Sequence, residues 1–220
     1  EGKAFNEAHW KLTRRLTHEA AEGLRYLISK GLFHRDLKAP NLLLDRDLKV
    51  KVADFGLAKA KDAHASNSGG APKGSAPWMA PENHDSAPYT EACDVYSFGM
   101  VLFELATRLQ PWAGASIVQI VKKISDGKRP EVPPGLSMPE DLRALMEQSW
   151  AQNPADRPTA AQVCAKLKAE CEAELAVAMP ALNEATAALD SLRPADISEL
   201  KTMKRPPQGV KLVMEAVCVM

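Results

Sequence analysis

The 220-residue chain carries 28 basic and 28 acidic residues, and 45% of its residues are hydrophobic. This composition is typical of a soluble globular protein, and the balanced charge excludes a global field that would recruit nucleic acid or a membrane surface. The longest apolar runs are far shorter than the roughly 20 residues that span a bilayer, and no charged-then-apolar leader opens the chain. We therefore expect a cytoplasmic protein without nucleic-acid or membrane partners, whose four cysteines are reduced thiols.

Residues 7–30 have the period of an amphipathic helix. Apolar residues recur at three- and four-residue steps along one face, and Gly31 supplies a stop signal. These residues are Leu12, Leu16, Ala20, Leu24, Leu27 and Ile28. The sequence predicts a long helix that buries this face.

The segment that follows concentrates polar side chains at short, fixed offsets. It reads His-Arg-Asp-Leu-Lys-Ala-Pro-Asn and ends at Asn41, and the triplet Asp-Phe-Gly begins thirteen positions later at Asp54. Asp36 can accept a proton from an attacking hydroxyl, and Asn41 and Asp54 offer the hard oxygens that Mg²⁺ prefers. Lys38 can neutralise charge that develops on a transferring phosphoryl group.

Two short apolar runs lie between these groups. Residues 42–44 and 48–53 flank a polar turn, which predicts a small β-hairpin. Asn41 and Asp54 come at the two free ends of this hairpin, so the hairpin brings both predicted metal ligands to the same place.

The eight-residue segment, its distance to Asp54 and the later triplet Ala80-Pro81-Glu82 resemble the catalytic loop, the metal-binding turn and the A-P-E triplet of protein kinases. The resemblance implies a mainly α-helical C-terminal catalytic lobe with one small hairpin, binding ATP and Mg²⁺ and acting on a protein substrate. Residues 7–30 would back the catalytic loop. Leu43 would form part of the adenine floor.

The next stretch, residues 57–77, is rich in Ala, Ser, Gly and Lys, which predicts a mobile loop. In kinases this is the activation segment, in which a phosphate on Ser66 or Ser68 would be gripped by cations that include Arg35. Unmodified serines in a flexible loop are an equally good interpretation of Ser66 and Ser68. Ser75 stands where the family usually has Thr, and its hydroxyl is expected to contact Asp36 and Lys38 instead of carrying phosphate.

Three charged residues have structural counterparts in the family. The resemblance pairs Glu82 with Arg157, and breaking such a buried pair costs about 3–5 kcal/mol. Asp94 matches the aspartate that orients the backbone of the catalytic loop. Each of the three could instead be a solvated surface charge.

Further helices are predicted at residues 95–106, 115–125, 139–152 and 159–168. The motifs Pro111-Trp112, Gly127 to Pro130 and Trp150 to Pro154 resemble the tyrosine-kinase-like group of serine/threonine kinases. Lys38 favours the same assignment, because dedicated tyrosine kinases usually carry Ala there. Transfer to Ser or Thr hydroxyls is therefore the predicted reaction.

A complete kinase domain opens with a β-rich lobe of roughly 80–100 residues that carries a Gly-rich loop, a strand lysine and a helix glutamate. Only about thirty residues precede His34 here, and none of these parts is present. We therefore expect residues 1–169 to be a partial kinase domain that is inactive in isolation.

Residues 170–220 have a different character. Leu175, Leu182 and Leu189 are seven residues apart, which predicts a short coiled-coil seam interrupted by Pro180. The sequence from residue 178 onward resembles the dynein heavy chain, from a stalk helix into the microtubule-binding domain. A terminal helix packed on the lobe is the alternative.

The tail also has a local excess of basic residues. In residues 193–220 these residues outnumber the acidic ones, which suits contact with an acidic microtubule surface but also a solvated face. Three classes of function therefore stand side by side: a serine/threonine kinase, a non-catalytic scaffold derived from a kinase or a fusion, and a cytoskeletal module.

Overall fold

The computed structural model describes residues 7–54, 59–60, 75–84 and 88–190. The chain forms two compact units, residues 1–172 and residues 173–220. The catalytic-loop and Glu82–Arg157 regions lie in the first unit, whereas Ser66, Ser68 and residues 193–220 lie outside the described residues. Within the described part of the chain, no helix is long and apolar enough to cross a membrane.

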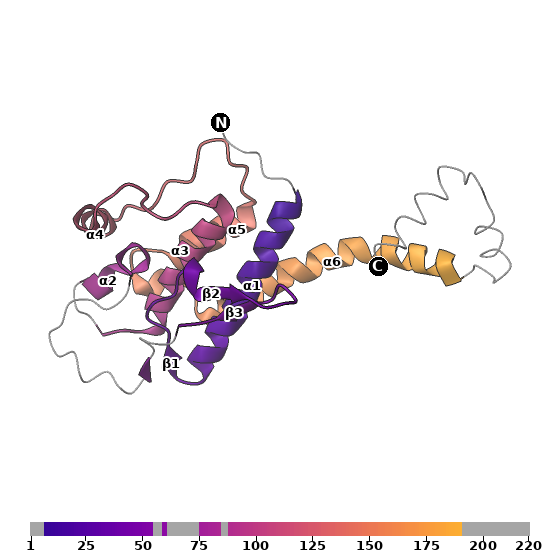
Figure 1. Ribbon diagram of the computed structural model, residues 1–220, viewed down its shortest axis with the longest axis horizontal. Coiled ribbons are helices and arrows are strands. Elements are labelled where there is room, and N and C mark those ends of the chain that lie inside the picture. Colours follow the sequence, from indigo (N-terminus) through magenta and orange to yellow (C-terminus); the bar gives the residue numbers. More distant parts are fainter. Residues whose placement is uncertain (1–6, 55–58, 61–74, 85–87, 191–220) are drawn as a thin grey trace. The chain divides into compact units, whose positions relative to one another are not determined.

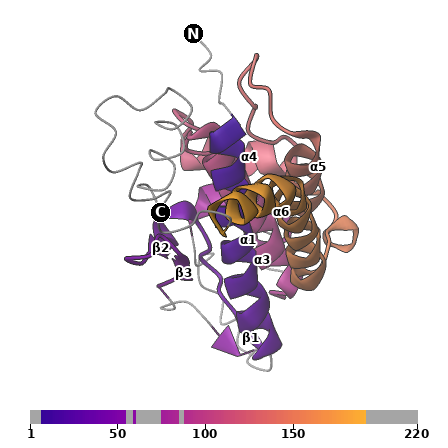
Figure 2. The same ribbon diagram turned by 90° about the vertical axis from the view of Figure 1, so that its right-hand side faces the viewer.

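The first unit is built on helices, as predicted. Its helical elements are α1 (Glu7–Ser29), η1 (Ala39–Asn41), η4 (Ala76–Trp78), α2 (Pro81–His84), α3 (Glu91–Thr107), α4 (Ile117–Ser125), α5 (Glu140–Ser149), η5 (Pro154–Asp156) and the start of α6 (Ala160–Asp190). Helix α3 is the centre of the unit and packs against both α1 and α5 (Figures 1 and 2). Its side chains from Cys93 to Phe103 are all buried, as expected from its apolar sequence.

Two glycines permit close approaches around this core. A Cβ atom on Gly99 of α3 would lie 3.1 Å from the backbone nitrogen of Trp150, so α3 and the end of α5 pack backbone to backbone. A Cβ atom on Gly23 of α1 would lie 2.5 Å from a methyl carbon of Val52, which is in the hairpin. Gly23 therefore lets the hairpin rest directly on α1.

The predicted hairpin is present. Strands β2 (Leu42–Leu44) and β3 (Val50–Val52) pair antiparallel, with Leu42 opposite Val52. A second pair, β1 (Leu32–Phe33) with β4 (Lys59–Ala60), was not predicted, because residues 57–77 were assigned entirely to a loop. Two-residue strands are too short to show the alternation on which strand prediction depends.

The last helix also differs from the prediction. The tail from about residue 170 is helical to Asp190, as predicted, but it is not separate: α6 runs without a break from Ala160 through Lys168 and includes Pro180. Residues 165–179 are mostly Ala, Glu, Lys and Leu, which favour helix, and they contain no Gly or Pro stop. In the second unit α6 exposes Leu175, Val177 and Met179, and the coiled-coil seam remains a prediction.

Candidate active site

The segment His34–Asn41, here called the HRD loop, is fixed by hydrogen bonds to one buried carboxylate. Asp94 of α3 accepts hydrogen bonds from the backbone N–H groups of His34 and Arg35, at 2.8 and 2.9 Å. The Tyr89 hydroxyl donates to the same side chain at 2.6 Å. Burial raises the pKa of Asp94, although these donors partly offset that effect. The expected contact between Asp94 and the loop backbone is therefore confirmed, and Asp94 is not a solvated charge.

Two residues of the site, one within the HRD loop and one directly after the hairpin, have left-handed backbone conformations. Arg35 has φ of +70° and Asp54 has φ of +61°. Such conformations cost about 1–3 kcal/mol for a non-glycine residue and persist where the surrounding structure fixes them. The two backbone hydrogen bonds to Asp94 and the packing of the Arg35 guanidinium on the Tyr89 ring, at 5.0 Å, supply that fixation at Arg35.

Asp36 lies within a compact set of hydrogen bonds. The Lys38 Nζ donates to Asp36 Oδ2 at 2.7 Å and to the Ser75 hydroxyl at 2.8 Å. The backbone N–H of Ser75 donates to Asp36 Oδ1 at 2.9 Å. Burial raises the pKa of Asp36, but the hydrogen bonds from Lys38 and Ser75 outweigh it and leave this pKa below its usual range. The carboxylate is therefore ionised at neutral pH, and the predicted contacts of Ser75 with both residues are present.

Asn41 and Asp54 are brought together by the hairpin. The backbone N–H of Ala53 donates to the Asn41 carbonyl at 2.9 Å, so Asp54 follows directly after the residue that pairs with Asn41. The side-chain nitrogen of Asn41 donates to the backbone carbonyl of Asp36 at 2.8 Å. Because its nitrogen is committed to this bond, the amide oxygen is what Asn41 can offer to a cation. His34 Nε2, 3.0 Å from the Ala53 carbonyl, ties the HRD loop to the same strand end.

The donor chemistry here suits Mg²⁺. One amide oxygen and one carboxylate are hard oxygen ligands, which Mg²⁺ prefers alongside phosphate oxygens and water. Asp54 is exposed and Asn41 is buried, so such a cation would lie at the edge of the hairpin. Leu43, predicted to contact adenine, is 55% exposed on the same hairpin.

The sequence did not indicate a role for Glu104, whose side chain contacts the HRD loop in the structure. One oxygen of this partly buried side chain accepts from the Ala39 backbone N–H at 3.1 Å and from the Trp78 indole N–H at 2.7 Å. Glu104 thus connects the loop to the segment that follows Ser75. The available signal was a single acid in the otherwise apolar run of residues 100–106.

The pair expected between Glu82 and Arg157 is also present. Arg157 donates to both oxygens of Glu82, at 2.6 and 2.8 Å, and its side chain is fully buried. This pair fastens the start of α2, just after Ser75 and Trp78, to the loop that precedes α6. It is a structural element and not part of the reacting set.

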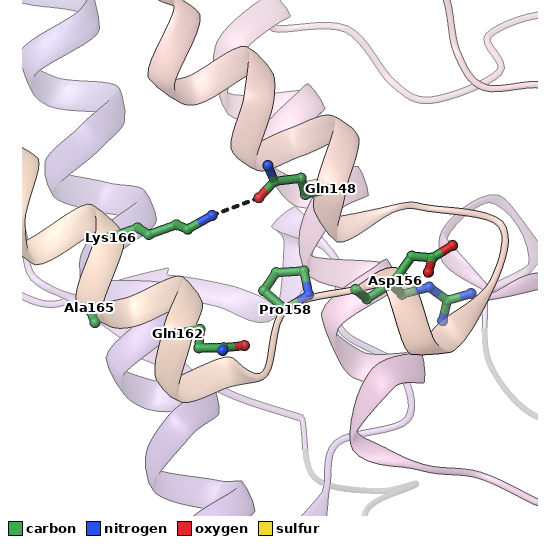
Figure 3. Close-up of a pocket in the computed structure, with 7 residues that line it drawn as sticks. Gln148, Asp156, Pro158, Gln162, Ala165 and Lys166 are labelled. Atoms are coloured by element: carbon green, nitrogen blue, oxygen red, sulfur yellow. Dashed lines mark hydrogen bonds between the residues drawn. The ribbon is translucent and has the colours of Figure 1, made fainter.

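The two hollows near these residues differ in chemistry. A cavity of about 10 Å³ lies beside Asp36 and is lined by Arg35, Ser75 and Tyr89, among others. A larger one of about 430 Å³ lies between the end of α5 and the first turns of α6, where Lys166 donates to Gln148 at 2.7 Å (Figure 3). Its lining (Gln148, Asp156, Arg157, Pro158, Gln162, Ala165 and Lys166) contains none of the predicted reacting groups. The larger hollow therefore lies outside the candidate active site.

A loop and a hairpin that together present a carboxylate, a lysine and an amide define a phosphoryl-transfer type of site. The sequence profile of the family "Protein tyrosine and serine/threonine kinase" matches residues 5–167. The chain therefore belongs to this family. A second profile, "Microtubule-binding stalk of dynein motor", matches residues 157–220.

Known relatives support the same assignment. The chain is 40% identical over 155 residues to Serine/threonine/tyrosine-protein kinase HT1 of Arabidopsis thaliana, an alignment that covers 70% of this chain and 39% of the relative. It is 41% identical over 155 residues to Probable serine/threonine-protein kinase drkD of Dictyostelium discoideum, covering 70% and 12%. It is also 40% identical over 151 residues to Serine/threonine-protein kinase CTR1 of Arabidopsis thaliana, an alignment that covers 67% of this chain and 18% of the relative. The chain thus spans well under half of the length of each of these relatives.

The two profile matches overlap at residues 157–167. In that stretch Ala160, Val163 and Leu167 belong to the same hydrophobic core as α1 and α3. The overlap is therefore an integral part of the first unit.

Proposed function

We propose that the first unit is the catalytic lobe of a serine/threonine kinase of the tyrosine-kinase-like group, which transfers phosphate from MgATP to protein hydroxyls. The observation that carries the proposal is the hydrogen-bonded set of Asp36, Lys38 and Ser75. The loop that carries Asp36 and Lys38 is itself fixed by hydrogen bonds to Asp94. The names of the relatives, which are mostly serine/threonine kinases, support the choice of Ser and Thr as acceptors.

Asp36 is assigned the role of proton acceptor. Its depressed pKa keeps it ionised, so it would orient the attacking hydroxyl and take its proton as the new oxygen–phosphorus bond forms and the bond from the γ-phosphorus to the bridging oxygen breaks, which releases ADP. Lys38, 2.7 Å from Asp36, places a positive charge where charge develops on the transferring phosphoryl oxygens. Ser75 joins the two through its backbone and side chain, which aligns the activation segment with the reacting groups.

Asn41 and Asp54 are assigned to Mg²⁺, and Leu43 to the adenine ring of ATP. The cation would neutralise phosphate charge. What the chain itself contributes is the spacing of the two ligands, fixed by the backbone bond from Ala53 to Asn41.

Arg35 is assigned to a phosphate on the activation segment. Its Nε is buried and has no hydrogen-bond partner within the described residues, while its guanidinium packs on Tyr89. A phosphorylated Ser66 or Ser68 would supply a charge-assisted partner. This is the regulatory part of the proposal.

The test is phosphate transfer to a generic Ser/Thr substrate protein. The 220 residues contain no glycine-rich G-x-G-x-x-G loop. We therefore compare the chain alone with the joined chain, in which the β-rich lobe of a related kinase precedes Glu1. We expect transfer by the joined chain, its loss in Asp36→Asn, and near-background transfer by the chain alone. No transfer by a folded joined chain would overturn the proposal and favour a non-catalytic scaffold.

We also propose that residues 193–220 contact microtubules, on the strength of the dynein-stalk profile match. The basic residues of this tail suit the acidic microtubule surface. Co-sedimentation with microtubules should detect weak, salt-sensitive binding by the full chain and none by a chain that ends at Glu172. Equal binding by both would refute this second proposal.

A further inference from the structure

Three potential metal ligands, none of them a proposed reacting group, meet between α1 and α6. They are His18 and Glu22 of α1 and Cys164 of α6. His18 and Glu22 are four residues apart and so lie on the same face of α1. Cys164, 142 positions after Glu22, is brought to them by the packing of α6 next to α1 (Figure 2).

The ligand atoms are close enough to bind one ion. Cys164 Sγ lies 2.8 Å from Glu22 Oε1, and His18 Nε2 lies 3.8 Å from the same oxygen. All three atoms are within 4.8 Å of one another. Ligand atoms on one tetrahedral zinc ion are about 3–4 Å apart, given zinc–ligand bonds of about 2.0–2.3 Å. Small side-chain rotations would therefore bring the three into coordination distance.

The hydrogen bonds around the cluster leave one nitrogen unused. Cys164 donates to Glu22 Oε1, and Arg25 donates to the other oxygen, Oε2, at 2.6 Å. His18 Nε2 is buried, yet it has no hydrogen-bond partner within the described residues. Unsatisfied buried nitrogens are uncommon, and binding of an ion is one of the standard reasons for them.

We propose that His18, Glu22 and Cys164 form a zinc-type metal site that fastens α6 to α1. A thiolate, an imidazole and a carboxylate suit Zn²⁺, whereas Mg²⁺ and Ca²⁺ take only oxygen ligands. Three protein ligands leave a fourth position that water can reach, since the His18 and Glu22 side chains are 23% and 40% exposed. Arg25 remains beside Glu22 as an outer partner that offsets the charge of the thiolate and the carboxylate.

The proposal is independent of the kinase activity and has its own chemical test. The full chain, freed of metal, is titrated with Co²⁺ and then with Zn²⁺. A cobalt–thiolate charge-transfer band with the strong visible bands of tetrahedral cobalt reports the ligand set, and the thermal midpoint reports stabilisation by Zn²⁺. The site variants are Glu22→Gln, His18→Gln and Cys164→Ser. The matched control is Cys171→Ser, two helical turns further along α6 and outside the cluster.

We expect one Co²⁺ per chain in the full chain and in Cys171→Ser, displaced by Zn²⁺ with a rise in thermal midpoint. Each site variant should weaken binding at least about tenfold, because losing even an outer-shell partner costs about 10–100-fold. If Cys164→Ser does not fold, Glu22→Gln and His18→Gln decide, since both side chains are partly exposed. No cobalt–thiolate band in the full chain, or a band that survives Glu22→Gln and His18→Gln or is lost in Cys171→Ser, would overturn the proposal.

Discussion

All five N–H groups of the Arg157 guanidinium are used, and two of them hold the two oxygens of Glu82 at 2.6 and 2.8 Å. The other three donate to the backbone carbonyls of Ala92, Ala151 and Gln152. One arginine thus gathers α2, the start of α3 and the loop before α6. The Arg157 guanidinium is planar and fully buried, so lysine could not make the same hydrogen bonds and Arg157→Lys would lower the stability of the fold.

The first prediction concerns the stability of this pair. Arg157→Ala should lower the free energy of unfolding by about 3–5 kcal/mol, because it leaves the largely buried Glu82 carboxylate without its partner. Lys168→Ala, which removes an exposed ion pair to Glu172, is the matched control and should cost less than about 1 kcal/mol. Urea unfolding of both variants measures the difference. A loss below about 1 kcal/mol in Arg157→Ala would contradict the burial of the pair.

The second prediction concerns acid sensitivity. Arg14 of α1 donates to both oxygens of Asp141 of α5, at 2.9 and 2.8 Å. Burial raises the pKa of Asp141, but the hydrogen bonds and the charge of Arg14 outweigh this effect and leave the pKa below its usual range. A carboxyl whose folded-state pKa is depressed stabilises the fold above its unfolded-state pKa. This stabilisation is lost as the pH falls through the folded-state pKa.

Asp141→Asn should therefore flatten the fall of unfolding free energy between about pH 5 and pH 2, the range in which paired aspartates are protonated. Unfolding in urea at a series of pH values measures this slope. The control is Asp47→Asn in the exposed turn of the hairpin, where no ion pair is described. An unchanged slope in Asp141→Asn would show that the pair does not contribute to acid stability.

The third prediction concerns the proton acceptor. In the joined chain, Asp36→Asn should lower kcat by about 10²–10⁴-fold, because it removes proton acceptance by a positioned side chain. The control is again Asp47→Asn, the same chemical change on an exposed aspartate eleven residues away. Comparable losses in both variants would indicate a folding effect and not a catalytic one.

Much of this site was predictable because it rests on short motifs at fixed offsets. The HRD loop, the hairpin and Asp54 are contiguous in sequence, so their arrangement follows from local structure. The contacts of Asp94 and of Glu82 with Arg157 were expected only through the resemblance to kinases, since they join residues 60 and 75 positions apart.

Three features were not predictable, each for a physical reason. Glu104 is a lone acid on an apolar helix, and sequence does not say which donors meet it. The β1–β4 pair is too short to produce a pattern. The cluster of His18, Glu22 and Cys164 depends on how α6 packs against α1, and the four cysteines have no C-x-x-C spacing that would indicate a metal site.

The fourth prediction concerns Ser75. Its hydroxyl accepts from Lys38 Nζ, and its backbone N–H donates to Asp36, so Ser75→Ala removes only the hydroxyl contribution. We expect kcat of the joined chain to fall several-fold in Ser75→Ala, and Ser75→Thr, which restores a hydroxyl, to keep the wild-type rate. Mass spectrometry after incubation with MgATP should find no phosphate on Ser75. Phosphate on Ser75 of the active protein would contradict this assignment.

The last prediction concerns Glu104 as a positioning residue. Its single accepting oxygen joins the Ala39 N–H of the HRD loop to the Trp78 indole three residues after Ser75. Burial raises the pKa of Glu104, which Trp78, Ala39 and Lys38 partly offset. The position of the HRD loop therefore depends on the accepting oxygen of Glu104 more than on its negative charge.

Two substitutions separate these properties. Glu104→Gln keeps an acceptor oxygen of the same reach, so the joined chain should retain most of its kcat. Glu104→Leu leaves the Ala39 N–H and the indole N–H of the buried Trp78 without this acceptor, and an unmet buried donor costs about 1–3 kcal/mol. We expect kcat to fall roughly tenfold, equivalent to about 1.4 kcal/mol, with the KM for ATP nearly unchanged because Glu104 contacts no predicted ATP ligand.

Steady-state kinetics of both variants, with urea unfolding alongside, make the test. Glu147→Leu on the exposed face of α5 is the matched control for replacing an acid by leucine, and it should leave kcat unaltered. A purely structural role would lower the stability of Glu104→Leu and leave kcat of the folded fraction unchanged in both variants. A near-wild-type kcat in Glu104→Gln and a reduced kcat in Glu104→Leu, both measured at temperatures where the proteins are folded, would establish that Glu104 positions the HRD loop against Trp78.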